Sequence, residues 1–259
     1  MREKILLDRR QLVIGLAAGT IIPLSGCADN AALGRSQLML ISDAEIHRLS
    51  ASAWRDTIQR ERVLNSPAYT RRLERVGTRM ADTSGLSHLD WEFVVIDSDL
   101  VNAWVLPNGK VAFYRGLLDL VETDGHIATI MGHEMGHVAG RHAAERASQQ
   151  RAAQMGMQLV GMALQTNGVD YDADMAAALG AGIQYGVILP YSREHEFEAD
   201  RLGIDYMTGA GYAARDAIDV WLAMSTMHQE RAAEFTSTHP SDDARIAAMR
   251  AHIAAQGYV

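Results

Sequence analysis

The chain has 259 residues, 48% of them hydrophobic, so it can bury a sizeable core and an intrinsically disordered protein is excluded. The formal net charge of -8 argues against a general nucleic-acid binder. The single cysteine, Cys27, excludes an intrachain disulfide framework and a cysteine-rich metal site.

Residues 1–26 have the anatomy of a secretory signal. A basic start, MREKILLDRR, precedes the apolar run QLVIGLAAGTIIPL, which is too short and too broken for a transmembrane helix. The LSGC segment at 24–27 resembles a bacterial lipobox. That resemblance implies cleavage before Cys27 and lipidation of its thiol, and Ala28 after it implies sorting to the outer membrane. The alternative is a free cysteine near a signal cleavage site. The two arginines before the run leave Sec and twin-arginine export both open.

Residues 27–40 are interpreted as a tether, and residues 41–259 as a single domain. Helices are expected over 43–62 and 68–82, the second with Leu73, Val76 and Met80 facing inward. A strand is expected at 91–96, and a hairpin of 101–106 with 111–114 around the turn PNGK.

A long amphipathic helix is expected next, starting at Thr123 or Asp124 and running to about Gln150. The later helices expected are a packed pair within 152–189, one from Ser192 through Met207, one or two in 213–235, and a last one around 241–255.

The most informative pattern is HEMGH at 133–137. Positions i and i+4 lie on one helix face, so the imidazoles of His133 and His137 can converge on one metal ion. Glu134 lies beside them, where it can accept a proton from the attacking water. Glu196, which opens EFEAD at 196–200, can complete a His2Glu zinc site with one open position. The pattern indicates a zinc peptidase, although HExxH also occurs by chance and a histidine pair is otherwise solvated surface.

Three glycines recur every four residues on this helix, at Gly132, Gly136 and Gly140. Glycine costs a helix interior about 1 kcal/mol relative to alanine, so the stripe predicts that another element packs very close. Gly203 is a matching position without a side chain on the helix that carries Glu196. We expect this close packing to bring Glu196 within ligand range.

Four segments resemble the zinc metallopeptidase family that includes HtpX, BepA, LoiP and the type I CAAX prenyl proteases. They are NAWVLPNGKVAFYRGLL at 102–118, HEMGHVAGRH at 133–142, SREHEFEADRLG at 192–203 and THPSDDARI at 238–246. ERVLNSP at 61–67 is also similar to the soluble, lipoprotein-type members. The resemblance implies an α+β fold, mostly helical and gluzincin-type, with a small β-sheet beside the HExxH helix. One departure is Gly125-His126, where the family often has Glu-Leu.

The same resemblance implies one zinc ion per chain. It makes His133, His137 and Glu196 the ligands and Glu134 the general base. Asp200, one turn after Glu196, would accept a hydrogen bond from a ligand imidazole and orient it; otherwise it is a solvated carboxylate. Other metals stay possible, because the affinity order of divalent ions leaves room for them.

Five further residues have open or secondary roles. We hypothesise that His239 approaches the zinc, as a fourth ligand in a resting state or as an oxyanion donor; otherwise it is a loop histidine. Arg245 either stabilises transition-state charge or anchors its segment, and Tyr191 is another oxyanion candidate. His142 is expected to be structural, and His195 to face elsewhere on its helix.

The implied function is a lipid-anchored periplasmic zinc endopeptidase that acts on unfolded or misassembled envelope proteins. We hypothesise that strand 111–115 is a sheet edge that pairs with extended substrate through backbone bonds. The alternative is a zinc-stapled, chaperone-like module that binds outer-membrane assembly proteins. Glu134 favours the enzyme, because a structural zinc site needs no base and usually has four protein ligands. A prenyl-protein processing enzyme fits poorly, because that branch has many membrane helices.

Overall fold

The computed structural model describes residues 26–166, 177, 180, 189–226, 239 and 243–258. The chain divides into two compact units, residues 1–42 with 144–193 and residues 43–143 with 194–259. Within the described ranges, no helix combines the length and the apolar character needed to cross a membrane. Residues 1–25, most of the segment interpreted as a secretory signal, lie outside the described residues.

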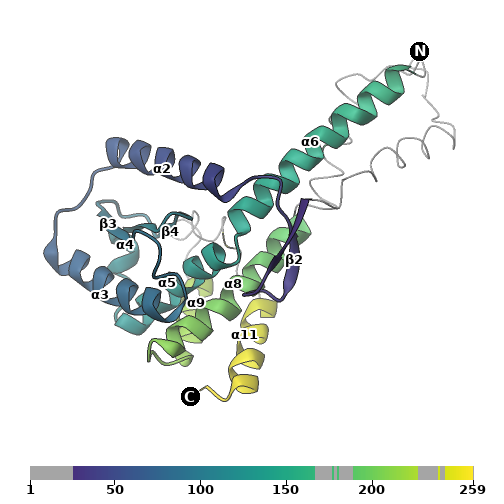
Figure 1. The fold of residues 1–259 in the computed structure, drawn as a ribbon. Helices are drawn as coiled ribbons and strands as arrows, with labels where there is room; N and C mark the ends of the chain where they lie inside the picture. Colours follow the sequence, from purple (N-terminus) through teal and green to yellow (C-terminus); the bar gives the residue numbers. More distant parts are fainter. Residues whose placement is uncertain are drawn as a thin grey trace, which may run out of the picture. The chain divides into compact units, whose positions relative to one another are not determined.

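The described elements are many helices and two small sheets, most of them labelled in Figure 1, which confirms the predicted α+β class. In chain order they are β1 (Cys27–Asn30), β2 (Arg35–Leu38), α2 (Asp43–Arg60), α3 (Pro67–Thr83), β3 (Glu92–Ile96), β4 (Ala103–Val105), β5 (Lys110–Tyr114), α4 (Arg115–Leu118), α5 (Asp124–Ala139), α6 (His142–Thr166), α8 (Leu189–Gly209), α9 (Arg215–Thr226) and α11 (Asp243–Gln256).

In the first unit, the segment interpreted as a tether contains a β hairpin. β1 and β2 pair antiparallel, and Cys27 is exposed opposite Leu38. The hairpin is tied to α6 through Glu145, whose buried carboxylate accepts two hydrogen bonds from Arg35 and one from Gln37. Charge-assisted bonds to a buried carboxylate are strong, and this partner lies far along the chain. The local sequence therefore did not reveal the hairpin.

The second unit contains a three-stranded sheet in the order β3-β5-β4. As predicted, β4 and β5 form an antiparallel hairpin, and its turn uses Gly109 with a φ of 85°. β3 adds to β5 in parallel, so Phe113 lies between Val95 and Ala103. The hypothesis that residues 111–115 form a sheet edge is therefore wrong, since β5 is paired on both sides.

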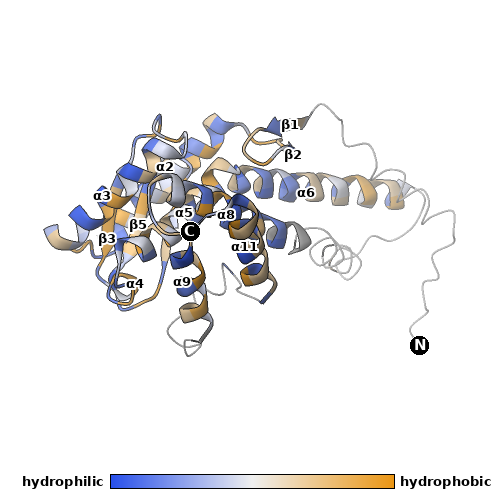
Figure 2. Cartoon of the chain, turned by 90° about the horizontal axis from the view of Figure 1, so that it is seen from below, coloured by the Kyte–Doolittle hydropathy of each residue, from blue (hydrophilic) through white to orange (hydrophobic). Residues whose placement is uncertain are grey.

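Helix α3 supplies much of the core under this sheet. Leu73, Val76 and Met80 are all fully buried, which confirms their predicted inward direction. They pack with Val95 and Phe113 of the sheet in one hydrophobic cluster. Figure 2 shows the matching hydrophobic colouring along β3 and β5. α5 packs against α3 on one side and α9 on another, so the motif-bearing helix is central to this unit.

The close helix contact predicted from the glycine stripe is present between α5 and α8. A Cβ added to Gly132 would lie 2.8 Å from the carbonyl oxygen of Gly203. A Cβ added to Gly136 would lie 2.6 Å from the carbonyl oxygen of Ala199. Both neighbours are backbone atoms, which cannot move aside cheaply. These two glycines therefore set the distance between the two helices.

The long helix expected to reach Gln150 is two helices, α5 and α6. Arg141 has a φ of 54°, a left-handed conformation that a helix cannot continue through. Gly140 does not face α8, because its added Cβ would instead lie 2.4 Å from Nε2 of His142. The third glycine of the stripe thus leaves room for the His142 ring to fold back toward α5.

Two boundaries differ from the sequence-based expectations. α8 begins at Leu189 rather than after a cap at Ser192, and it ends before Gly211, whose φ is 80°. Most of the segment after Thr166 that was expected to complete a helix pair lies outside the described residues, as does the part of the expected helical segment 213–235 that follows Thr226.

Candidate metal centre

Helix α5 presents the HEMGH motif on its buried side. The hydroxyl of Thr123 accepts a hydrogen bond from the backbone N–H of His126 and caps the first turn. His133 is 1% exposed and Glu134 is 4% exposed. The helical spacing brings Nε2 of His133 to 3.2 Å from Nε2 of His137.

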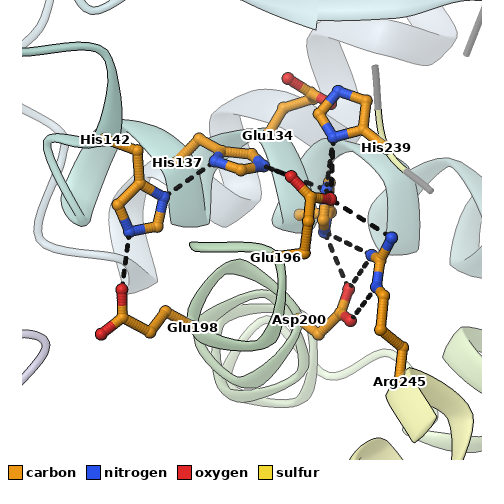
Figure 3. Close-up of polar contacts among 9 residues, drawn as sticks. Glu134, His137, His142, Glu196, Glu198, Asp200, His239 and Arg245 are labelled. Carbon is orange, nitrogen blue, oxygen red and sulfur yellow. Dashed lines mark hydrogen bonds and ion pairs between the residues drawn. The ribbon is translucent and has the colours of Figure 1, made fainter. Parts of the chain in front are cut away.

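Glu196 reaches this pair from α8. Its Oε2 lies 3.2 Å from Nε2 of His133, and its Oε1 lies 3.3 Å from Nε2 of His137. Figure 3 shows the carboxylate aimed at the imidazoles from the facing helix. The structure thus brings together the three side chains that the sequence predicted as metal ligands, together with His239.

The spacing of these atoms fits a tetrahedral metal ion. Nitrogen and oxygen ligands at 2.0–2.1 Å from zinc would be about 3.3 Å apart in a tetrahedron. The two imidazole nitrogens are 3.2 Å apart, and Glu196 reaches them with different oxygens, Oε2 at 3.2 Å from His133 and Oε1 at 3.3 Å from His137, so each neighbouring pair has this spacing. In addition, Oε1 of Glu134 is buried and has no hydrogen-bond partner among the described residues. A buried carboxylate oxygen in that state is suited to a bound water.

His133 is held on its far side by Asp200. Its Nδ1 donates to Oδ1 of Asp200 at 2.8 Å, which leaves Nε2 directed at the metal position. Arg245 holds Asp200 in turn with two hydrogen bonds of 2.7 Å, and its guanidinium lies 4.0 Å from the centre of the Trp221 ring. Arg245 is 1% exposed, and its Nη1 also lies 3.2 Å from Glu196. Of the two roles considered for Arg245, this geometry favours the anchor.

The two motif histidines have opposite pKa shifts. Burial alone would lower the pKa of His133, but hydrogen bonds with Asp200 and Glu196 raise it to about 9. Burial lowers the pKa of His137 well below its ordinary value, and the hydrogen bond with Glu196 does not offset this. Burial would raise the pKa of Glu196, but hydrogen bonds from the histidines lower it strongly. Without a metal, His133 is therefore the motif histidine that carries an extra proton, and metal binding must displace this proton.

His239 lies in the same group, close to the position hypothesised for it. Its Nδ1 is 3.0 Å from Nε2 of His133 and 3.1 Å from Oε2 of Glu196. Its Nε2 faces the other way, 3.4 Å from Oε1 of Glu134, and Figure 3 shows the two side chains together. Nδ1 is therefore spaced like a fourth ligand, while Nε2 faces the predicted base.

Some predicted residues lie elsewhere, and some contacts were not predicted. The side chain of Tyr191 lies outside the described part of the chain, and Cys27 belongs to the other unit. The sequence analysis missed Trp221, because a tryptophan on an amphipathic helix carries no signal of a metal site. It also missed that His142 contacts His137, with Nδ1 atoms 2.8 Å apart.

Comparisons with known proteins agree with this geometry. The model of peptidase family M48 matches residues 67–253. The chain is 31% identical over 204 residues to the mitochondrial metalloendopeptidase OMA1 of Schizosaccharomyces pombe, covering 77% of this chain and 58% of the relative. It is 27% identical over 268 residues to the mitochondrial metalloendopeptidase OMA1 of Homo sapiens, covering 95% and 50%. It is 27% identical over 241 residues to the beta-barrel assembly-enhancing protease of Escherichia coli, covering 88% and 46%.

The chain belongs to peptidase family M48, because the family model covers most of its length. This confirms the resemblance found in the sequence. The peptidases of this family depend on a metal, which agrees with the His-His-Glu group. The chain spans about half the length of the curated relatives described above.

Proposed function

We propose that this protein is a zinc-dependent endopeptidase. The observation that carries the proposal is the convergence of two imidazole nitrogens and the Glu196 carboxylate, at 3.2–3.3 Å, beside the buried Oε1 of Glu134. A zinc ion held by His133, His137 and Glu196 would supply a Lewis acid for the scissile carbonyl and for water. Imidazole nitrogens and one carboxylate oxygen are the donor set that zinc takes in peptidases.

The side chains around the metal position each have a separate role in the reaction. Glu134 accepts the proton of the attacking water at Oε1 and then delivers it to the leaving amine. Asp200 keeps His133 in the tautomer whose Nε2 is free, and Arg245 fixes Asp200. Nδ1 of His239 is spaced like a fourth ligand, so His239 would occupy the open position and would have to move away before a substrate carbonyl could bind there.

Extended polypeptide is the substrate class that we propose. Since β5 is central, we assign substrate pairing to β4, the other strand of the hairpin, which packs beside α5 and has β5 on only one side. Main-chain pairing gives affinity without strict sequence preference, which suits unfolded or misassembled proteins. We further propose that these are cell-envelope proteins, supported by the lipobox-like segment ending at Cys27 and by the name of the Escherichia coli relative.

The lipobox-like segment and the name of the Escherichia coli relative also support a location at the periplasmic face of the outer membrane, with a lipid on Cys27 as the anchor. Proteins of outer-membrane assembly are the partners that this location would offer. The competing function is a chaperone-like module in which zinc only stabilises the fold. The buried carboxylate of Glu134 favours the enzyme, because a structural site needs no base and the Oε1 atom has no hydrogen-bond partner among the described residues that would give it a purely structural role.

The deciding experiment is digestion of an unfolded protein by zinc-loaded residues 28–259. The test variant is Glu134→Gln, and the matched control is Glu194→Gln, which changes an exposed glutamate on α8. We expect cleavage by the wild type and the control, and a loss of about 100-fold or more in Glu134→Gln at equal zinc content. Equal cleavage by both variants would remove Glu134 as the base. Absence of cleavage in all three, with tight binding of unfolded protein, would favour the chaperone-like module.

A further inference from the structure

A second hydrogen-bond chain leaves the candidate metal centre through His137. Nδ1 of His137 lies 2.8 Å from Nδ1 of His142, and Nε2 of His142 lies 3.1 Å from Oε2 of Glu198. Figure 3 shows this chain running from the metal position to the Glu198 carboxylate. His142 is fully buried, and the ring of His195 stacks on it with centroids 4.2 Å apart and planes 10° apart. The middle ring of the chain is therefore held in one orientation.

The order of protons in this chain follows from the metal position. A neutral imidazole carries one N–H, so His137 with Nε2 on a metal carries its proton on Nδ1. That proton is donated to Nδ1 of His142, which must then be an acceptor. The proton of His142 accordingly lies on Nε2, where the acceptor is the carboxylate of Glu198. Only this order of protons lets His142 donate to the Glu198 carboxylate, and it leaves the metal side of His137 unprotonated.

His142, His195 and Glu198 also have ligand atoms close enough to hold a metal themselves. A metal on Nε2 of His142 would move the ring proton to Nδ1, which would then donate to Nδ1 of His137. His137 would have to carry its proton on Nε2, the atom that faces the main site. With neutral imidazoles the two sites exclude each other, so the second group serves the first as a hydrogen-bond chain.

The backbone is specifically shaped to build this contact. Arg141 adopts a left-handed φ of 54°, which is costly for a residue with a side chain and persists where the surroundings require it. Gly140 provides the space that the folded-back ring of His142 fills. At the far end, Glu198 borders a cavity of about 320 Å³ that also touches Arg201 and His252.

We propose that His142 and Glu198 are positioning residues for the metal centre, which hold His137 in the tautomer and orientation that leave its Nε2 free for the metal. The inference rests on the proposed metal centre and extends it. It gives His137 a support equivalent to the one that Asp200 gives His133. Such partners of ligand imidazoles are generally important, because their loss weakens metal binding by about 10–100-fold.

The test compares His142→Asn with His142→Leu in the full mature chain. The two side chains have the same size and branching, and both lose the stacked ring. Only asparagine keeps an acceptor where Nδ1 of His142 stands. We expect His142→Leu to bind zinc about 10–100-fold more weakly than the wild type in a chelator competition, and His142→Asn to retain most of the affinity. The absorption spectrum of the cobalt-substituted protein should change in the leucine variant and stay close to wild type in the asparagine variant.

Two controls make each outcome decisive. His252→Leu breaks another histidine–carboxylate bond, to Asp205 at 2.7 Å, and should leave zinc affinity unchanged. Glu198→Gln keeps the volume and an acceptor oxygen but removes the charge. We expect it to bind zinc about 10-fold more weakly than the wild type. This measurement still tests the inference if His142→Leu fails to fold.

Equal zinc affinities of the asparagine and leucine variants, or an unchanged affinity in Glu198→Gln, would overturn the inference while leaving the metal centre intact. Two zinc ions per wild-type chain, one of them lost in His142→Leu, would also overturn it in favour of a second metal site. A wild-type chain that binds no zinc would overturn the metal centre itself, and this inference with it.

Discussion

Replacing Gly203 by alanine tests whether the α5–α8 contact sets the geometry of the metal centre. The added Cβ would lie 2.7 Å from the backbone nitrogen of His133 and 2.8 Å from the carbonyl carbon of Gly132. These atoms belong to a helix backbone and cannot rotate away, so the two helices must separate. Overpacking of this kind costs about 1–3 kcal/mol. Removing a helical glycine returns about 1 kcal/mol, so a net loss of up to about 2 kcal/mol in unfolding free energy is expected.

The matched control is Gly209→Ala on the same helix. Its Cβ would make an ordinary contact with Cβ of Thr83 at 3.7 Å, so this variant should keep the helix-propensity gain. The difference between the two variants in denaturant unfolding of the metal-free chain isolates the overpacking term. Zinc affinity should fall in Gly203→Ala alone, because the strain acts on the backbone of a ligand. Equal stability and equal zinc affinity in the two variants would refute the idea that this contact positions Glu196.

Two other perturbations test the site and the unit around it. His239→Ala should bind zinc more weakly and turn over faster, because Nδ1 of His239 is spaced like a fourth ligand that blocks the open position; unchanged zinc content with unchanged turnover would contradict this role. Asp124 gives a pH dependence. Burial would raise its pKa, but hydrogen bonds from Arg75 and Arg72 lower it below 3.8. Because its folded-state pKa is lowered, Asp124 stabilises the protein at pH values above the pKa of the unfolded chain, and this stabilisation is lost as the pH falls. In an acid titration, the unfolding free energy should therefore fall less steeply in Asp124→Asn. Parallel curves for the two proteins would count against the ion pairs.

The parts of the site that the sequence predicted are those encoded by spacing along one helix. His133 and His137 follow from i and i+4 on α5, whereas Glu196 followed from the EFEAD block and its family resemblance, and the glycines on the two helices predicted only that α8 packs close enough to bring it into range. Such patterns report local geometry directly. The helix ends were less predictable, since the break between α5 and α6 depends on a left-handed Arg141 that no residue type signals.

Strand order and distant partners could not be predicted in the same way. β5 was taken for an edge because its hairpin with β4 is local, whereas its parallel pairing with β3 is a tertiary choice. The hairpin of β1 and β2 depends on Glu145, more than a hundred residues away in the chain. The direction of His142 depends on the same backbone turn that ends α5. In each case the residue that determines the local structure lies outside the segment whose sequence pattern was interpreted.

The charges around the candidate centre explain why a divalent ion suits it. Glu196, Asp200 and Glu198 supply three carboxylates, and Arg245 supplies one guanidinium that pairs with two of them. The result is two net negative charges in a buried group, which a divalent cation would neutralise. In its absence the proton on His133, whose pKa is raised to about 9, offsets part of that charge. Glu134 is separate from this charge balance, and its buried carboxylate, with Oε1 3.4 Å from Nε2 of His239, is the group that we propose accepts a proton during the reaction.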